Sequence, residues 1–184
     1  MTDCLPPAIA SLLTASSTPE ALFDALMPAL GAFLDCDRCF LYLRDPATRL
    51  GRVAFCWKRH PDIPTVYDQD WKLEPADLPD RDPMFAAALR TDPSIFVEDV
   101  ETASPQVLNR QFEQESFGHR ALIHAHLCHD KQLWGVLQPC VFDHSRKWTP
   151  AEREVIAQIV PAITPKAIAY THEAVRALQA NANR

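Results

Sequence analysis

The sequence is poor in glycine, in long apolar runs and in positive charge. With only 4 glycines in 184 residues, a glycine-rich loop that cradles phosphate has little to be built from. No apolar run approaches the roughly 20 residues that a membrane-spanning helix needs. The first residues, MTDCLPPAIA, lack the basic and apolar regions of a secretory signal. A cytoplasmic protein without a membrane span is therefore predicted.

The formal net charge is −6 at pH 7. Binding to nucleic acid requires a basic surface that replaces counterions, so this charge argues against a nucleic-acid partner. Neither a nucleophile elbow nor an HExxH motif occurs. We therefore expect a binding protein and not an enzyme.

The six cysteines are scattered along the chain, and without an export signal reduced thiols are expected. Cys36 and Cys39 have CxxC spacing, which is compatible with a redox pair or half of a zinc site. No second CxxC accompanies them, and Cys39 falls where a core strand needs an apolar residue. A thiol enzyme that uses this pair, Cys128 or Cys140 is the least favoured alternative. The full set is Cys4, Cys36, Cys39, Cys56, Cys128 and Cys140.

Periodicity and turn residues predict helices and strands in mixed order. Thr18 and Pro19 begin a helix, and a Thr149–Glu152 capping box begins the last one. Pro161 and Pro165 are expected to bend or interrupt that last helix. Strands are predicted at 38–44, 51–57 and 94–100 and in a hairpin across 129–131, with short helices at 82–89 and 107–115 and a long loop over 61–82. Hairpin connections favour an antiparallel sheet, so the fold class is α+β with helices on both faces of the sheet.

Three segments resemble the GAF domain family. They are PEALFDALMPALGAFLDCDRCFLYLRD, RALIHAHLCHDKQLWGVL and IAYTHEAVRAL. The stretch Leu133–Leu137, followed by Arg146-Lys147-Trp148, is similar to cyanobacteriochromes and phytochromes, and Asp82-Pro83-Met84-Phe85 looks like their Asp-x-Cys-Phe motif. The resemblance implies a GAF-like, three-layer domain over 17–184, preceded by an N-terminal extension at 1–16.

The departures from that pattern bear on function. Relatives of this branch hold a bilin, a linear tetrapyrrole, by a thioether bond to cysteine. Here Met84 has no thiol to form that bond, and the second attachment point falls near Asn109, which cannot form it either. The position of the chromophore-contacting histidine is taken by Cys140, after Gln138. Ligand binding without the usual covalent bond is therefore expected, with the ligand unknown and a bilin or haem among the possibilities.

The predicted ligand-binding residues combine this resemblance with the aromatic residues around the long loop. They are Trp57, Trp71, Asp82, Met84, Phe85, Asn109, Phe117, Ile123, Gln138 and Cys140.

Histidine and cysteine on the hairpin raise two further alternatives. His124 and His126 share one strand face, which favours either metal or haem ligation or an ordinary strip of hydrogen-bonded imidazoles. A hairpin that turns at 129–132 sets Cys140 opposite Ala121, on the other face from the two histidines. There Cys140 is either a reactive thiol that captures a ligand or an ordinary buried one.

Three functions follow as hypotheses. The first is a non-catalytic sensory or regulatory GAF domain that binds a small or tetrapyrrole-like ligand non-covalently. The second is a ligand-free protein that acts by protein–protein interaction, with a protein partner or a homodimer through its terminal helices. The third is a bilin photoreceptor with an atypical cysteine attachment.

Overall fold

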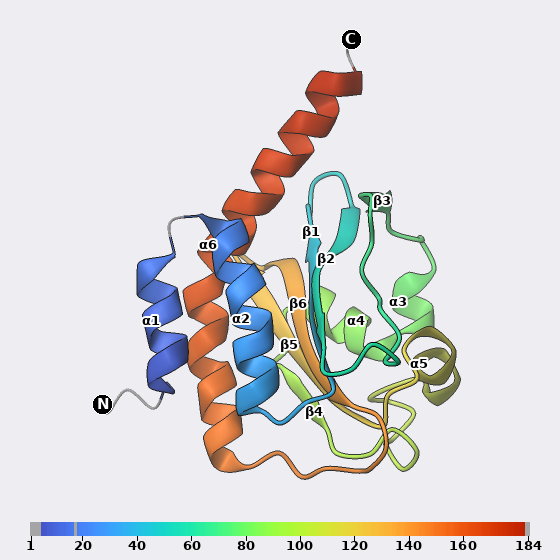
Figure 1. Cartoon of the computed structure of the whole chain (residues 1–184). Helices are drawn as coiled ribbons and strands as arrows, with labels where there is room; N and C mark the ends of the chain where they lie inside the picture. Colours follow the sequence, from blue (N-terminus) through green and yellow to red (C-terminus); the bar gives the residue numbers. More distant parts are fainter. Residues whose placement is uncertain (1–4, 17, 183–184) are drawn as a thin grey trace.

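The computed structural model describes residues 5–16 and 18–182. Its centre is a six-stranded sheet with strand order β3-β2-β1-β6-β5-β4, in which every neighbouring pair is antiparallel (Figure 1). The strands are β1 (Arg38–Arg44), β2 (Leu50–Lys58), β3 (Lys72–Leu73), β4 (Ile95–Val97), β5 (Ala121–His129) and β6 (Gln132–Val141). The helices are α1 (Pro7–Ala15), α2 (Pro19–Phe33), α3 (Leu78–Arg81), α4 (Pro83–Leu89), α5 (Arg110–Ser116) and α6 (Pro150–Ala182).

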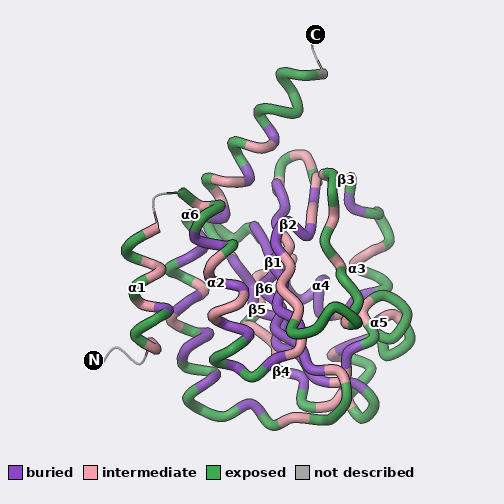
Figure 2. Tube along the Cα trace, in the orientation of Figure 1, coloured by how far each residue is buried: buried purple, intermediate pink, exposed green. Residues whose placement is uncertain are grey.

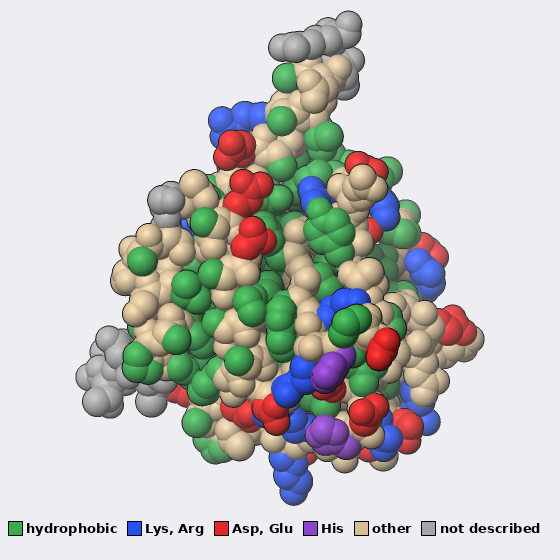
Figure 3. Space-filling view, viewed as in Figure 1, with side chains coloured by type: hydrophobic (Ala, Val, Ile, Leu, Met, Phe, Trp, Pro, Cys, Tyr) green, Lys and Arg blue, Asp and Glu red, His purple; other side chains and the backbone are tan. Residues whose placement is uncertain are grey.

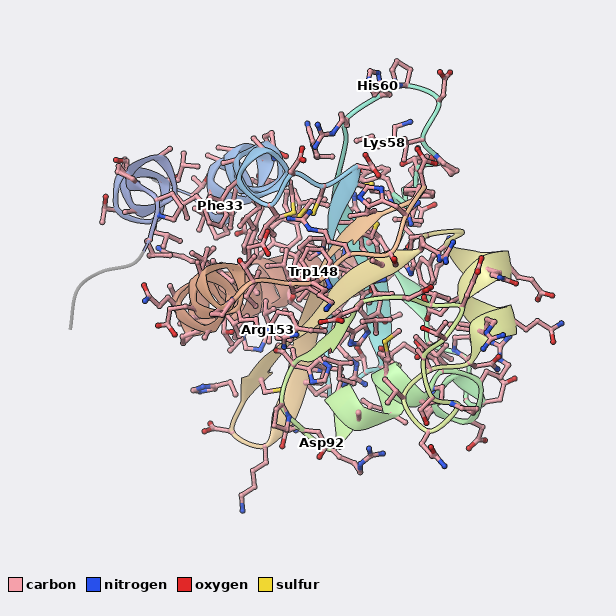
Figure 4. The ribbon with its side chains drawn as sticks, turned by 90° about the horizontal axis from the view of Figure 1, so that it is seen from below. Phe33, Lys58, His60, Asp92, Trp148 and Arg153 are labelled. Atoms are coloured by element: carbon pink, nitrogen blue, oxygen red, sulfur yellow. The ribbon has the colours of Figure 1, made fainter. Side chains whose placement is uncertain are left out.

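The helices form a layer on each face of the sheet. Helices α1, α2 and α6 cover one face, and α3, α4 and α5 lie on the other (Figure 1). The view from below in Figure 4 shows the same layers, with Phe33 of α2 on one side of the sheet and Asp92, which follows α4, on the other. The main core lies between the sheet and α2 and α6. The predicted three-layer α+β architecture is confirmed.

Local capping explains where the two long helices begin. The Thr18 side chain accepts a hydrogen bond from the Ala21 amide at the start of α2. At the start of α6, the Thr149 amide donates to Glu152 Oε2 at 2.7 Å, and the Glu152 amide donates back to Thr149 Oγ1 at 3.3 Å. The capping box predicted from sequence is therefore present, and it satisfies amides that have no partner within the helix.

Helix α6 continues through both of its prolines, so the predicted interruption is wrong. Pro161 and Pro165 are both exposed. The carbonyl groups that lose their amide partners therefore lie on the solvent side, where water replaces the lost hydrogen bonds. The helix changes direction along its length, and its C-terminal end projects beyond the body of the protein (Figure 1).

The N-terminal extension contains a helix that the sequence pattern did not reveal. Helix α1 packs against α2, and Ile9 is only 1% exposed within the main core. Figure 2 shows buried residues concentrated along the sheet and the inner sides of these helices, whereas the projecting end of α6 is mostly exposed. Two sequence predictions, the thiol of Cys4 and the start of the domain at Ser17, lie outside the described residues.

A bulge in the hairpin corrects the predicted position of Cys140. Next to the turn, His129 pairs with Gln132, but the register shifts by one residue between Leu127 and Cys128. Cys140 therefore pairs with Leu122 instead of Ala121. A shift of one residue moves a side chain to the opposite face of a sheet. Cys140 thus lies on the same face as His124 and not on the opposite one.

No helix in the described ranges is long and apolar enough to cross a bilayer. On the face drawn in Figure 3, the coloured Lys and Arg side chains are interspersed with Asp and Glu and form no continuous basic surface.

Candidate functional site

A cavity of about 220 Å³ lies between the sheet and the layer of α3, α4 and α5. Leu73, Pro75 and Leu78 contribute to its apolar wall, together with five aromatic side chains and two valines of the sheet. The aromatic residues and the valines are Phe40, Tyr42, Phe85, Phe112 and Phe117, with Val53 and Val136. A concave, mainly apolar site with a few polar groups is the usual form of a small-molecule site.

Strand β1 supplies the floor of the cavity through its alternating pattern. Side chains two residues apart share a strand face, so Phe40 and Tyr42 point to the cavity while Cys39, Leu41 and their neighbours enter the main core. Gly51 lies on the adjacent strand, where an added Cβ would come within 1.8 Å of the Tyr42 hydroxyl oxygen. Glycine at this position therefore makes room for the Tyr42 ring.

The outer wall is the segment between β2 and α3, and a buried ion pair holds it to the sheet. Arg44 Nε and Nη2 donate to the two carboxylate oxygens of Glu74 at 2.7 and 2.9 Å. The Tyr42 hydroxyl donates to Glu74 Oε1 at 2.6 Å. At the rim, Lys72 donates to Asp68 at 2.7 Å. The rim carboxylates are thus already paired with cations.

Asp82 is different, because no cation pairs with it among the described residues. It caps α4, and its Oδ1 accepts from the amides of Met84 and Phe85, each at 3.0 Å. Its second carboxylate oxygen, Oδ2, has no hydrogen-bond partner among the described residues. Asp82 lines the cavity. Burial raises the pKa of Asp82 to about 6, against the opposing effect of the two amides.

Glu113 of α5 is a second buried carboxyl group, only 1% exposed. Arg38 Nη2 lies 3.4 Å from His119 Nδ1, and because arginine can only donate, Nδ1 accepts. His119 Nε2 therefore carries the proton and donates to Glu113 Oε2 at 2.7 Å. Burial raises the pKa of Glu113 to about 8, with Arg38 acting in the opposite direction. Glu113 is thus largely protonated at neutral pH.

The two hairpin histidines form a directed pair. His126 Nδ1 lies 2.7 Å from the Asp92 carbonyl oxygen, which can only accept, so Nδ1 carries the proton. Its Nε2 then accepts from His124 Nδ1 at 2.9 Å. Burial lowers the pKa of both imidazoles, so both are neutral. His124 lines the cavity with its unprotonated Nε2 as a hydrogen-bond acceptor.

Gln138 of β6 also lines the cavity. Its side chain is almost entirely buried, at 3% exposure. Its Nε2 has no hydrogen-bond partner among the described residues. Burying an unsatisfied amide costs roughly 1–3 kcal/mol, so Gln138 is a polar group whose partner is expected from outside the chain.

The structure places part of the predicted site at this cavity. Asp82, Phe85, Phe117 and Gln138 line it, as does His124. Among the described residues no group of three metal-binding side chains occurs.

Three predicted residues lie on the opposite face, and their assignment to the cavity is wrong. Ile123 is the residue next to His124 in β5, so strand alternation turns its side chain to the opposite face of the sheet, into the main core. Trp57 packs against the same core, with its ring over Gly31 of α2. Trp71 also packs against that core.

The other three lie near the cavity but do not line it. Met84 and Cys140 are buried in a small apolar cluster with Leu122. Asn109 is exposed and caps α5, with its Oδ1 accepting from the Phe112 amide. The Cys140 thiol donates to the Arg38 carbonyl at 3.6 Å and is fully buried.

The described cysteines offer no reactive thiol at the cavity. Cys36, Cys39, Cys56, Cys128 and Cys140 are all free, and none of them lines it. Burial raises the pKa of Cys36, Cys39 and Cys128, which favours the unreactive thiol form. Neither a redox pair at Cys36 and Cys39 nor cysteine attachment of a ligand is supported.

Sequence reasoning missed the polar network at the cavity, where Glu113 is one of the lining residues. Arg38, Glu113 and His119 are buried and bonded to one another, but they come from three separate segments. One signal was available, since Arg38, Phe40, Tyr42 and Arg44 occupy alternate positions of one strand. Two arginines that bracket two aromatic residues on one strand face indicate a buried polar surface and not a simple core strand.

The chain belongs to the GAF domain family, whose model matches residues 18–163. Comparison with curated proteins found no match.

Among solved structures, the PixJ GAF domain of Thermosynechococcus elongatus in its blue-light-absorbing form has 20% identity and a TM-score of 0.60, covering 94% of each chain. The phycoerythrobilin-bound GAF domain of a cyanobacterial phytochrome has 20% identity and a TM-score of 0.66, covering 89% of this chain and 92% of that one. The GAF domain of an Acinetobacter phosphoenolpyruvate-protein phosphotransferase has 12% identity and a TM-score of 0.65, covering 90% of each. At these identities the likeness shows the fold. The similar structures come from light-absorbing proteins and from others.

A tetrapyrrole does not fit the cavity as the structure has it. Cavities that bind drug-sized ligands measure roughly 300–1,000 Å³, and a molecule of four pyrrole rings with their side chains is at least drug-sized. The cavity here has about 220 Å³. No described cysteine lines it, so a thioether bond to cysteine has no attachment point there.

Proposed function

We propose that this protein is a non-catalytic sensory or regulatory GAF domain that binds a small molecule non-covalently in the cavity between β1, β6, α4 and α5. The observation that carries the proposal is the unpartnered amide of Gln138 inside an aromatic-walled cavity. A buried polar group without a partner is costly unless a ligand or water satisfies it. The neutral imidazoles and the absence of any described cysteine from the cavity lining argue for binding over catalysis.

The ligand is smaller than a tetrapyrrole. The cavity of about 220 Å³ accommodates a molecule with one or two rings. Protein expressed together with haem and bilin biosynthesis should therefore be colourless and should show no absorption change on titration with either pigment. A pigment that copurifies and absorbs visible light would show that the segment between β2 and α3 opens to admit it, and would restore the photoreceptor hypothesis.

The proposal is tested by filling the cavity. A library of small aromatic fragments is screened by ligand-observed NMR against the wild type, Val136→Phe and Val160→Phe. Val136 lines the cavity, whereas Val160 of α6 packs against the main core on the other face of the sheet. Fragments should bind the wild type and Val160→Phe but not Val136→Phe. If no fragment is lost in Val136→Phe, the cavity is not the binding site.

One observation also favours self-association. The end of α6 projects beyond the body of the protein (Figure 1) and carries Leu178 at 42% exposure. We propose a homodimer through this end, in a cytoplasmic setting that suits the free cysteines. Light scattering during size exclusion should give twice the monomer mass for the wild type and the monomer mass for Leu178→Glu. A monomeric wild type would refute the dimer.

A further inference from the structure

Two hydrogen-bond acceptors at the polar end of the cavity have no donor among the described residues. Asp82 Oδ2 is free because Oδ1 takes both helix amides. His124 Nε2 is an acceptor because of the proton order set by the Asp92 carbonyl. The amide of Gln138 adds one acceptor oxygen and the two N–H donors of Nε2. A ligand that satisfies Asp82 and His124 must donate to them, while the Nε2 donors of Gln138 call for an acceptor on the ligand or a bridging water.

The charges around the cavity also favour a ligand that donates hydrogen bonds and carries positive charge. The rim carboxylates are neutralised within the protein, Glu74 by Arg44 and Asp68 by Lys72. Asp82 has no ion-pair partner among the described residues, although it is only 7% exposed. A buried carboxylate without a cation is costly, and a positively charged ligand would relieve that cost.

The walls determine the shape of the ligand. The rings of Phe40 and Phe117 are stacked, 5.9 Å between centroids and 11° between planes. Tyr42 and Phe85 meet edge to face, 6.2 Å between centroids. Such walls favour a flat aromatic body, and aromatic faces also attract cations.

We propose that the cavity selects a small aromatic cation, such as an aromatic amidine, whose N–H groups donate to Asp82 and whose ring lies among the phenylalanines. This inference rests on the proposed function and adds the charge and chemistry of the ligand. The buried cations do not line the cavity, because the Arg38 guanidinium donates to the carbonyls of Pro64 and Phe117 and Arg44 is paired with Glu74.

Three probes of equal shape and different charge test the proposal. Benzamidine is a cation, benzamide is neutral and benzoate is an anion, and each is small enough for 220 Å³. Titration calorimetry at pH 7.5 should show benzamidine binding at least tenfold more tightly than benzamide, and benzoate not binding. This pH lies above the pKa of about 6 of Asp82, so the carboxylate is ionised.

Two asparagine variants locate the effect. Asp82→Asn keeps a capping oxygen for α4 but replaces the free acceptor by a donor. It should weaken the binding of benzamidine at least tenfold and leave the affinity for benzamide within about threefold of the wild-type value. Asp80→Asn makes the same charge change two residues away on an exposed side chain that does not line the cavity, and should leave both affinities unchanged.

The outcomes separate this inference from the proposed function. Benzamide binding as tightly as benzamidine, or an equal loss in both asparagine variants, would overturn the selection of a cation. So would the failure of all three probes to bind. If fragments nevertheless bind the wild type and not Val136→Phe, the binding cavity stands without this selectivity. The thermal midpoint of Asp82→Asn, compared with that of Asp80→Asn, verifies that both variants fold.

Discussion

At the scale of single residues, the buried amide of Gln138 destabilises the ligand-free protein. Its Nε2 is buried without a partner among the described residues. Gln138→Met keeps the length of the side chain and removes the unsatisfied polar atoms, so it should stabilise the ligand-free protein by about 1 kcal/mol. Urea denaturation measures the change. Gln132→Met, on the exposed start of the same strand, should change stability by less than about 0.5 kcal/mol, and equal effects of both variants would contradict the assignment.

Glu113 makes stability depend on pH. Burial raises its pKa from the usual 4.5 to about 8 in the folded protein, so between these values the folded state binds more protons than the unfolded state. The contribution of Glu113 to the free energy of unfolding therefore falls as the pH rises from 4.5 to about 8, by at most about 1.4 kcal/mol per pH unit. Glu113→Gln removes the titration, so the variant should gain stability relative to the wild type on going from pH 5 to pH 8.

The measurement is urea unfolding of both proteins at pH 5, 6, 7 and 8. Asp82 also titrates with a raised pKa, at about 6, and the charge of Glu113 is one cause of that rise, so the comparison is decisive between pH 7 and 8, where Asp82 is ionised in both proteins. A difference between Glu113→Gln and wild type that stays constant across the four pH values would show that Glu113 does not titrate in this range.

At the scale of elements, the ends of helices and strands were predicted where local chemistry determines them. Thr18, Thr149 and Glu152 cap their helices as expected, because capping involves residues within one turn. The bulge between Leu127 and Cys128 was not predicted, because nothing within the hairpin sequence forces it. That single shift moved Cys140 to the other face of the sheet and, with it, changed the predicted anchor for a ligand.

The cavity itself was partly predictable for the same reason. Asp82 and Phe85 belong to one short motif, and both line it. Trp57, Trp71 and Ile123 were assigned by closeness in sequence or by alignment, and strand alternation put them in the main core. Glu113 and His119 could not be joined to Arg38 from sequence, because their contact depends on how the α5 segment crosses the sheet.

The capping box of α6 gives a prediction at this scale. Thr149→Val removes the oxygen that accepts the Glu152 amide, at 3.3 Å, and keeps the shape of the side chain. Loss of such a cap typically costs about 1 kcal/mol. Thermal denaturation should therefore show a lower midpoint for Thr149→Val. Thr14→Val, at an exposed position in α1, is the control, and a midpoint for Thr149→Val no lower than that of the control would mean that the cap does not limit stability.

At the scale of the whole molecule, the question is whether residues 1–16 are an appendage or part of the folding unit. Ile9 is 1% exposed in the same core as α2 and α6, so we propose that the domain extends to include α1. Ile9→Ala should then destabilise the entire protein by about 2–5 kcal/mol, as large-to-small core substitutions do.

The four tryptophans make this testable, because none of them lies in α1; they are Trp57, Trp71, Trp134 and Trp148. Their fluorescence reports the unfolding of the sheet and of α6, not the fraying of the first helix. In a single cooperative unit, Ile9→Ala shifts the urea midpoint of tryptophan fluorescence, whereas Ser11→Ala on the exposed side of α1 leaves it in place. If α1 were an appendage, the fluorescence midpoint would be the same in both variants, and only the far-ultraviolet helical signal would show an early loss.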